Sequence, residues 1–134
     1  MRTKPLILIV DDEKSFIEII STKLESLGYD TTYASNARSG VLKAKELLPD
    51  LILMDIHMPP GQNGVEAALE IKHIPECKNL KIAFFSNLKD PWPAMAGDKG
   101  EVSQELGMED FLEKTENLDA LAEKIRAILE RKPA

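Results

Sequence analysis

Three aspartates follow two short apolar segments of the sequence. Asp11 and Asp12 come directly after LILIV (6–10), and Asp55 comes directly after LILM (51–54). A carboxylate beside a buried segment is costly unless a cation or a hydrogen-bond donor compensates it. If the three carboxylates lie together they repel one another, so a cation is expected among them. Mg²⁺ suits a site that offers carboxylates, a backbone carbonyl, and room for waters and a phosphate oxygen.

Two further residues with reactive side chains also follow apolar segments. Ser86 follows KIAFF (81–85), and Lys114 follows EDFLE (109–113). Each candidate has a structural alternative, because an aspartate pair often caps a helix, a serine often lies in a turn and a lysine is usually solvated. His57 has no cysteine or histidine companions, so we interpret it as a loop residue rather than an imidazole ligand. The functional interpretation is favoured because the other candidates are all expected at the same end of one sheet, namely Asp11, Asp12, Asp55, Ser86 and Lys114.

The apolar segments alternate with segments of helical period, and this alternation predicts the fold. Expected strands cover 6–10, 31–34, 51–54, 81–85 and 109–113, and expected helices run from Phe16 to Gly28 and over 36–48, 64–74 and 117–131. Strands buried on both faces and separated by helices indicate a parallel sheet wrapped by helices. We therefore predict an α/β fold, a flavodoxin-like (βα)5 three-layer sandwich with strand order 2-1-3-4-5. Residues 1–134 are expected to form a single domain.

This fold predicts where the candidate residues meet. Ligands of such sheets bind beyond the carboxyl ends of the strands, at the point where the strand order reverses. For the order 2-1-3-4-5 that point lies between the first and third strands, so Asp11, Asp12 and Asp55 should converge in one shallow cleft. The fourth and fifth strands should bring Ser86 and Lys114 to the same end of the sheet.

Four stretches of the chain resemble the receiver domains of two-component response regulators. They are ILIVDDEKSF, PDLILMDIHMP, IAFFS and EDFLEK, and the likeness covers nearly the whole chain. The resemblance implies that Asp55 accepts a phosphoryl group from the phosphohistidine of a sensor histidine kinase or a phosphotransfer protein. It also implies that Asp12 and Asp55 bind Mg²⁺ directly, Asp11 mainly through water, and His57 through its backbone carbonyl.

The same resemblance implies a conformational switch. Lys114 would pair with Asp55 and then with the phosphoryl oxygens, and Ser86 would hydrogen-bond to the same group. Phe111 matches the aromatic residue that changes rotamer on activation. Drawing Ser86 inward would open space for Phe111, a local packing change that an unknown output domain or effector protein could read. Such a chain is not a metabolic enzyme, since its chemistry is limited to its own phosphorylation and dephosphorylation.

Three features depart from the usual receiver pattern. The loop MPPGQNG (58–64) is one residue longer than usual, Thr115 stands where the family normally has proline, and the segment 86–114 is longer by several residues. Because the segment is longer than usual and shows little helical period from residue 86 to about residue 99, we expect the fourth helix to be short, displaced or poorly ordered.

Two other functions stay open at this point. A pseudo-receiver would bind partners without being phosphorylated, and the altered loops are compatible with that. A phosphatase of the haloacid dehalogenase type also uses an aspartate nucleophile. That family needs a second aspartate two residues after the first, and here His57 occupies the position.

Composition limits the possible partners. The net charge of −6 has the wrong sign for a phosphate backbone, so no direct nucleic-acid binding is expected. Cys77 is the only cysteine, so no internal disulfide can form and nothing indicates an oxidising compartment. No stretch approaches the roughly 20 apolar residues that span a bilayer. We expect a cytoplasmic protein without a membrane partner.

Overall fold

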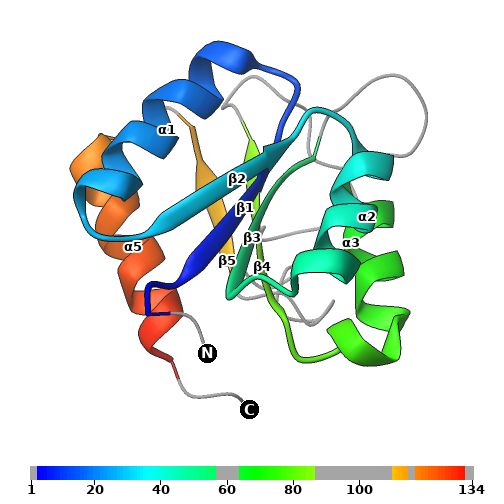
Figure 1. The fold of residues 1–134 in the computed structure, drawn as a ribbon. Coiled ribbons are helices and arrows are strands. Elements are labelled where there is room, and N and C mark those ends of the chain that lie inside the picture. The colour runs from blue at the N-terminus through cyan, green and yellow to red at the C-terminus, as the bar shows by residue number, and fades with distance from the viewer. Residues whose placement is uncertain (1–2, 57–63, 87–109, 115–116, 132–134) are drawn as a thin grey trace.

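A parallel sheet of five strands forms the central layer of the computed structural model (Figure 1). The structure describes residues 3–56, 64–86, 110–114 and 117–131, and of Ser86, Asp110 and Phe111 the backbone alone. The strands are β1 (Leu6–Val10), β2 (Asp30–Ala34), β3 (Leu51–Asp55), β4 (Lys81–Ser86) and β5 (Asp110–Glu113). Their order, β2-β1-β3-β4-β5, confirms the predicted order 2-1-3-4-5.

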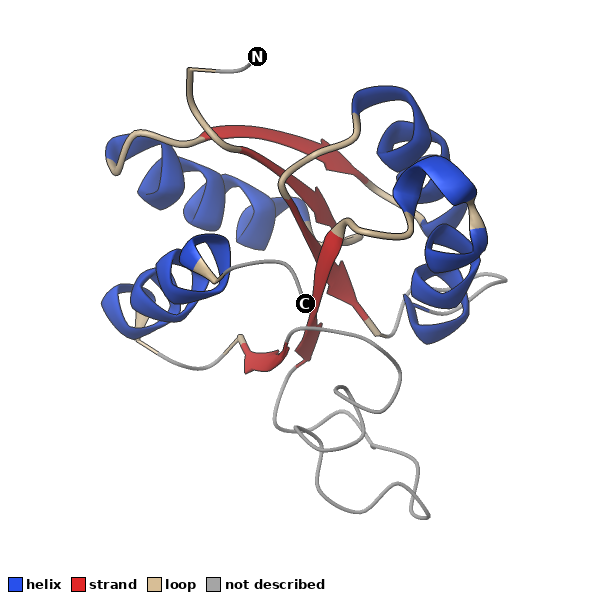
Figure 2. Cartoon of the chain, turned by 90° about the horizontal axis from the view of Figure 1, so that it is seen from below, coloured by secondary structure: helices blue, strands red, loops and turns tan. Residues whose placement is uncertain are grey.

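Helices cover both faces of this sheet. They are α1 (Lys14–Ser26), α2 (Ala37–Leu47), α3 (Gly64–His73), the short 3₁₀ helix η1 (Pro75–Cys77) and α5 (Leu118–Glu130). Helices α1 and α5 lie on one face, and α2 and α3 lie on the other (Figures 1 and 2), which confirms the three-layer sandwich. The expected fourth helix would fall in 87–109, outside the described residues. Among the described helices, none combines the length and the apolarity needed to cross a bilayer.

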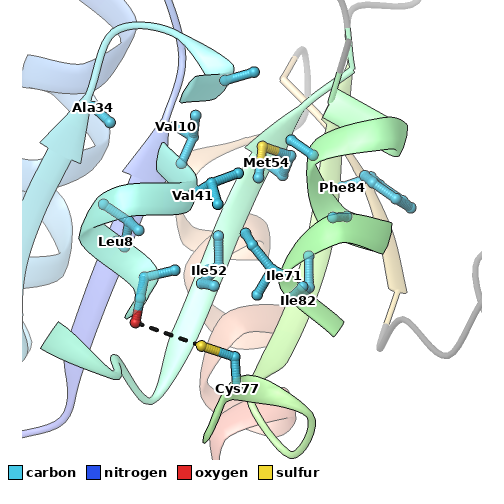
Figure 3. Packing of buried hydrophobic residues seen from close by; sticks show 14 of the residues in the cluster. Leu8, Val10, Ala34, Val41, Ile52, Met54, Ile71, Cys77, Ile82 and Phe84 are labelled. Atoms are coloured by element: carbon cyan, nitrogen blue, oxygen red, sulfur yellow. Dashed lines mark hydrogen bonds between the residues drawn. The ribbon is translucent and has the colours of Figure 1, made fainter. Parts of the chain in front are cut away.

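The sheet separates two hydrophobic cores, because consecutive strand residues point to opposite faces. The core toward α2 and α3 (Figure 3) includes the strand residues Leu8, Val10, Ile52, Met54, Ile82 and Phe84. The core toward α1 and α5 includes the strand residues Ile7, Ile9, Leu51, Leu53, Ala83 and Phe85. Burial on both faces explains why these strands consist of continuous apolar segments rather than alternating ones.

Side chains and a glycine fix the ends of three helices. The Asn36 side chain accepts a hydrogen bond from the Ser39 N–H (2.8 Å) and caps α2, and the Asn117 side chain accepts from the Asp119 N–H (2.8 Å) and caps α5. Gly28 follows α1 with φ +95°, a left-handed conformation that glycine adopts without a steric penalty. The predicted helix boundaries are therefore confirmed to within one or two residues.

A lysine connects the amino end of the sheet to the last helix. Lys81 begins β4, and its Nζ donates to the carbonyl oxygens of Ile128 (2.8 Å), Leu129 (3.1 Å) and Arg131 (2.6 Å) at the carboxyl end of α5. The last carbonyls of a helix have no partner within it, and a cation there also suits the helix dipole. Cys77, in η1 just before β4, is fully buried, with its Sγ 3.9 Å from a carbonyl oxygen of α2 (Figure 3).

Strand β2 forms one edge of the sheet, as the sequence predicted. The carbonyl of Ala34 faces β1 and accepts the Asp11 N–H (3.0 Å). The carbonyl of Tyr33 therefore faces the free edge, because carbonyls alternate along a strand. Lys43 from α2 donates to this Tyr33 carbonyl and lies 5.4 Å from the centre of the tyrosine ring.

Candidate functional site

The three aspartates named from the sequence meet at the carboxyl end of the sheet. Each offers a carboxylate oxygen, and these oxygens all lie within 4.8 Å of one another. Strands β1 and β3 are neighbours with Val10 opposite Met54, so the residues that follow them are brought side by side. Asp11 and Asp55 are buried, with 1% and 3% exposure, and Asp12 is exposed. The predicted convergence of the aspartates is confirmed.

Asp11 combines a structural and an electrostatic role. Its Oδ1 accepts the Glu13 N–H (2.9 Å) in a turn just before α1. The N-cap residue of α1 is Glu13, without a side-chain cap hydrogen bond, so the alternative that the aspartate pair caps this helix is wrong. Its Oδ2 is buried and, in the part of the chain that the structure describes, accepts no well-aligned hydrogen bond. The Lys114 ammonium lies 2.7 Å from this oxygen as an ion pair. Burial raises the pKa of Asp11, and the Lys114 charge and the Glu13 N–H offset that rise only in part.

Lys114 is surrounded by carboxylates rather than by solvent. Its side chain is 4% exposed, and Nζ lies 2.7 Å from Asp11 Oδ2, 2.7 Å from Glu13 Oε1 and 3.4 Å from Asp55 Oδ2. Burial alone lowers the pKa of the ammonium, but the three carboxylates outweigh burial and hold the pKa above its ordinary value. The solvated alternative is therefore wrong, and Lys114 is a fixed positive charge within the acidic cluster.

Two aromatic rings support the lysine. The Lys114 Nζ lies 4.9 Å from the centre of the Phe16 ring, a cation–π arrangement. Phe16 in turn packs edge-on against Phe85 of β4, with 5.3 Å between the ring centres. Neither Phe16 nor Glu13 was predicted for the site from the sequence. The only signal was their position at the start of the helix after the aspartate pair, where such residues are ordinary.

The backbone of α3 forms a wall beside Asp55. A Cβ atom on Gly64 would lie 1.9 Å from the carbonyl oxygen of Asp55, so no other residue fits without moving backbone. The Gly64 N–H donates to the Ile56 carbonyl (2.9 Å) and fixes the helix at this distance. From the sequence, Gly64 was predicted only as the start of a helix. The close approach of its backbone to the Asp55 carbonyl leaves no local pattern in the sequence.

The remaining predicted residues are placed by backbone alone or lie outside the described part. Ser86 ends β4 directly after Phe85, and Phe85 pairs with Asp55 across the sheet. Phe111 lies in β5 opposite Phe84, three residues before Lys114. Their strand positions agree with the prediction, and their side chains are outside what the structure describes. His57, the 58–63 loop, Thr115 and the 87–109 segment also lie outside the described residues.

The donor set fits a hard divalent cation. Asp11, Glu13 and Asp55 surround the Lys114 ammonium, and Asp12 lies in the same aspartate cluster, so negative charge is in excess. The buried Asp11 Oδ2 accepts no well-aligned hydrogen bond within the described residues, so the Lys114 ammonium beside it compensates its charge but leaves acceptor capacity unused. All the ligand atoms are oxygens, which Mg²⁺ prefers over nitrogen or sulfur.

Comparison with known proteins identifies the family. Residues 7–126 match the family model described as the response regulator receiver domain. The chain belongs to this family. Receiver domains are signalling modules rather than classical enzymes.

In two curated relatives the similar region is part of a longer chain. The response regulator ArlR of Staphylococcus saprophyticus is 31% identical over 127 residues, which cover 95% of this chain and 53% of ArlR. The alkaline phosphatase synthesis transcriptional regulatory protein PhoP of Bacillus subtilis is 31% identical over 129 residues, covering 93% of this chain and 48% of PhoP. The chain thus spans about half the length of these relatives.

Solved structures agree with this assignment. The N-terminal domain of a response regulator/sensory box/GGDEF three-domain protein from Carboxydothermus hydrogenoformans is 28% identical, with a TM-score of 0.77 over 92% of this receiver domain and 93% of that chain. A CheY-like receiver domain protein from Methanospirillum hungatei, 24% identical, has a TM-score of 0.81 over 96% of this chain and 95% of its own. The second match supports the fold alone.

Proposed function

We propose that this receiver domain accepts a phosphoryl group on Asp55, in a Mg²⁺-dependent reaction with a phosphohistidine. The donor would be a sensor histidine kinase or a phosphotransfer protein. One observation carries the proposal: the Asp55 carboxylate lies in a cluster with Asp11 and Asp12, and the Lys114 ammonium is 3.4 Å from its Oδ2. A carboxylate that attacks an anionic phosphoryl group needs positive charge on the same side, and this arrangement supplies it.

Asp55 is the best nucleophile of the three aspartates. Asp11 is engaged at the start of α1, where Oδ1 accepts the Glu13 N–H and Oδ2 forms the 2.7 Å ion pair with Lys114. Asp12 is exposed, so its carboxylate is the least confined of the three. Asp55 is buried at the end of the central strand, and its contact with Lys114 is the longest of the three that the ammonium makes.

The reaction exchanges one bond to phosphorus for another. A carboxylate oxygen of Asp55 attacks phosphorus, and the bond from phosphorus to the histidine nitrogen breaks. With a proton on its other ring nitrogen, the phosphohistidine leaves as neutral imidazole, and Asp55 carries an acyl phosphate. Asp12 and Asp55 would hold Mg²⁺ directly, with Asp11 through water and the backbone carbonyl of His57. When bound, the ion neutralises charge between the carboxylate and the phosphoryl oxygens. The protein supplies only position and charge, so phosphorylation and dephosphorylation are self-catalysed.

Side chains on the neighbouring strands would then respond to the charge of the phosphoryl group on Asp55. Lys114 would pair with the phosphoryl oxygens, the Ser86 hydroxyl would donate to them, and Phe111 would turn toward the space that Ser86 leaves. These residues follow or belong to β4 and β5, next to Asp55 in the sheet. We propose that the change controls an unknown output domain or effector protein, with residues 1–134 as a single receiver domain in the cytoplasm.

Phosphorylation from a small donor tests the proposal. Incubation with acetyl phosphate and Mg²⁺ should add one phosphoryl group to the wild type, seen by intact-protein mass spectrometry, and EDTA should prevent it. Asp55→Asn should take no label, because an amide is not a nucleophile toward the phosphoryl group. Asp30→Asn, which removes an exposed carboxylate at the opposite end of the sheet, should be labelled like the wild type.

The other outcomes separate the alternatives. A folded wild type that takes no label and binds no beryllofluoride would be a pseudo-receiver. Continuous hydrolysis of phosphate monoesters would instead favour a phosphatase. Label that persists in Asp55→Asn would move the acceptor to another residue.

A further inference from the structure

The contacts of Lys114 include a carboxylate that the proposed chemistry does not use. Glu13 Oε1 lies 2.7 Å from Nζ, as close as Asp11 Oδ2, whereas Asp55 Oδ2 lies 3.4 Å away. An ammonium group has three donors and three carboxylates lie around this one, so all three carboxylates determine where Nζ lies. In the arrangement seen here, the ammonium lies closer to Asp11 and Glu13 than to the proposed phosphoacceptor.

The two closer carboxylates differ in how easily they could release the lysine. The Asp11 side chain is 1% exposed, so the loss of Lys114 would leave a buried charge without a cation. The Glu13 side chain is 49% exposed, so water can replace the ammonium around it. Glu13 is therefore the partner that Lys114 can exchange at the lower cost.

We propose that Glu13 is a positioning residue, which holds Lys114 back from Asp55 at rest and releases it when a phosphoryl group arrives. The inference rests on the proposed function, because it needs an anionic group on Asp55. Phosphoryl oxygens carry more charge than a carboxylate and form strong hydrogen bonds with an ammonium. The phosphoryl group must then replace the ion pair between Lys114 and Glu13, so the strength of that pair opposes the change.

Neutralising Glu13 tests this exchange. In Glu13→Gln the side chain keeps its size and loses its charge, so Lys114 should be more available to an anion on Asp55. Beryllofluoride binding in the presence of Mg²⁺, measured by isothermal titration calorimetry, should tighten roughly two- to fivefold, since exposed ion pairs are weak. Glu18→Gln removes another exposed carboxylate of α1 and should change the affinity little. Circular dichroism would confirm that both variants fold.

A second measurement needs neither metal nor phosphate. The NMR resonance of the Lys114 Cε methylene in the metal-free protein should shift in Glu13→Gln, and should stay in place in Glu18→Gln. If the wild type binds beryllofluoride and Glu13→Gln binds it equally or more weakly, the role of Glu13 is overturned and the phosphoacceptor function stands. A wild type that binds no beryllofluoride would overturn both.

Discussion

Two lysines at opposite ends of the sheet show how the same side chain serves structure and chemistry. Lys81 begins β4 and donates to three backbone carbonyls at the end of α5, whereas Lys114 follows β5 and lies against three carboxylates. The carbonyls are neutral and fixed by the helix, so Lys81 simply completes a helix end. The carboxylates are charged and in excess, so Lys114 leaves negative charge uncompensated. The amino-end lysine therefore completes a helix end, whereas the carboxyl-end lysine lies in the proposed phosphoryl-transfer site.

The tightest steric constraint at the carboxyl end of the sheet is the contact between Gly64 and the Asp55 carbonyl. We expect Gly64→Ala to destabilise the fold by about 3 kcal/mol or more, because the new Cβ meets backbone rather than a movable side chain. Urea unfolding followed by circular dichroism measures the loss.

Gly28→Ala is the matched control for that substitution. Gly28 has φ +95° but open space beside it, since a Cβ added there would meet nothing within 4 Å. Gly28→Ala should lower the free energy of unfolding by about 1 kcal/mol, which is the penalty for an alanine in the left-handed conformation. Equal losses in the two variants would mean that α3 can move away from Asp55, and the idea of a rigid wall would fail.

Loss of Lys81 at the amino end of the sheet should lower the stability of the fold and leave phosphorylation unchanged. We expect Lys81→Met to cost about 2 kcal/mol, since a charged donor to the last carbonyls of α5 is removed. Hydrogen exchange should speed up in the last turn of α5. Mg²⁺-dependent labelling by acetyl phosphate should be retained, whereas Lys114→Met should impair it. Lys78→Met, at an exposed position just after η1, controls for the loss of one positive charge.

A smaller effect concerns pH at the amino end. Burial raises the pKa of the Cys77 thiol, and the negative charge of Glu76 raises it further. The neutral thiol is thus favoured by the folded state, so its contribution is complete below the unfolded pKa of about 8.5 and is lost as pH rises through the folded pKa. The free energy of unfolding should fall above that pH in the wild type.

Cys77→Ala isolates this contribution. The variant should show a weaker fall in stability at alkaline pH, although its stability at neutral pH is lower because a buried side chain is shortened. Parallel pH dependences in the two proteins would show that the thiol stays neutral or accessible in both states.

Much of the architecture could be predicted from the sequence, because the signals were local and repeated. The apolar runs indicated the strands, the alternation with helical segments indicated the parallel order, and Asn36 and Gly28 marked helix ends. The same topology argument brought Asp11 and Asp55 together, since residues at the carboxyl ends of neighbouring parallel strands must meet at one edge.

The details of the site could not be predicted, because they depend on side-chain reach and backbone distance. Apart from its position after the aspartate pair, Glu13 is an ordinary glutamate in the sequence, yet its carboxylate is as close to Lys114 as that of Asp11. Gly64 likewise resembles an ordinary helix start until the Asp55 carbonyl is seen beside it. Both are consequences of the packed structure rather than of a motif.

The position of β2 at the edge of the sheet has a further consequence for the association of protein molecules at high concentration. An unpaired strand edge is a template on which the strand of another molecule can add, which is how many aggregates begin. In this protein the Lys43 ammonium occupies the outward carbonyl of Tyr33 and places a charge along the path of an incoming strand. We therefore expect Lys43 to hinder the edge-to-edge association of two molecules.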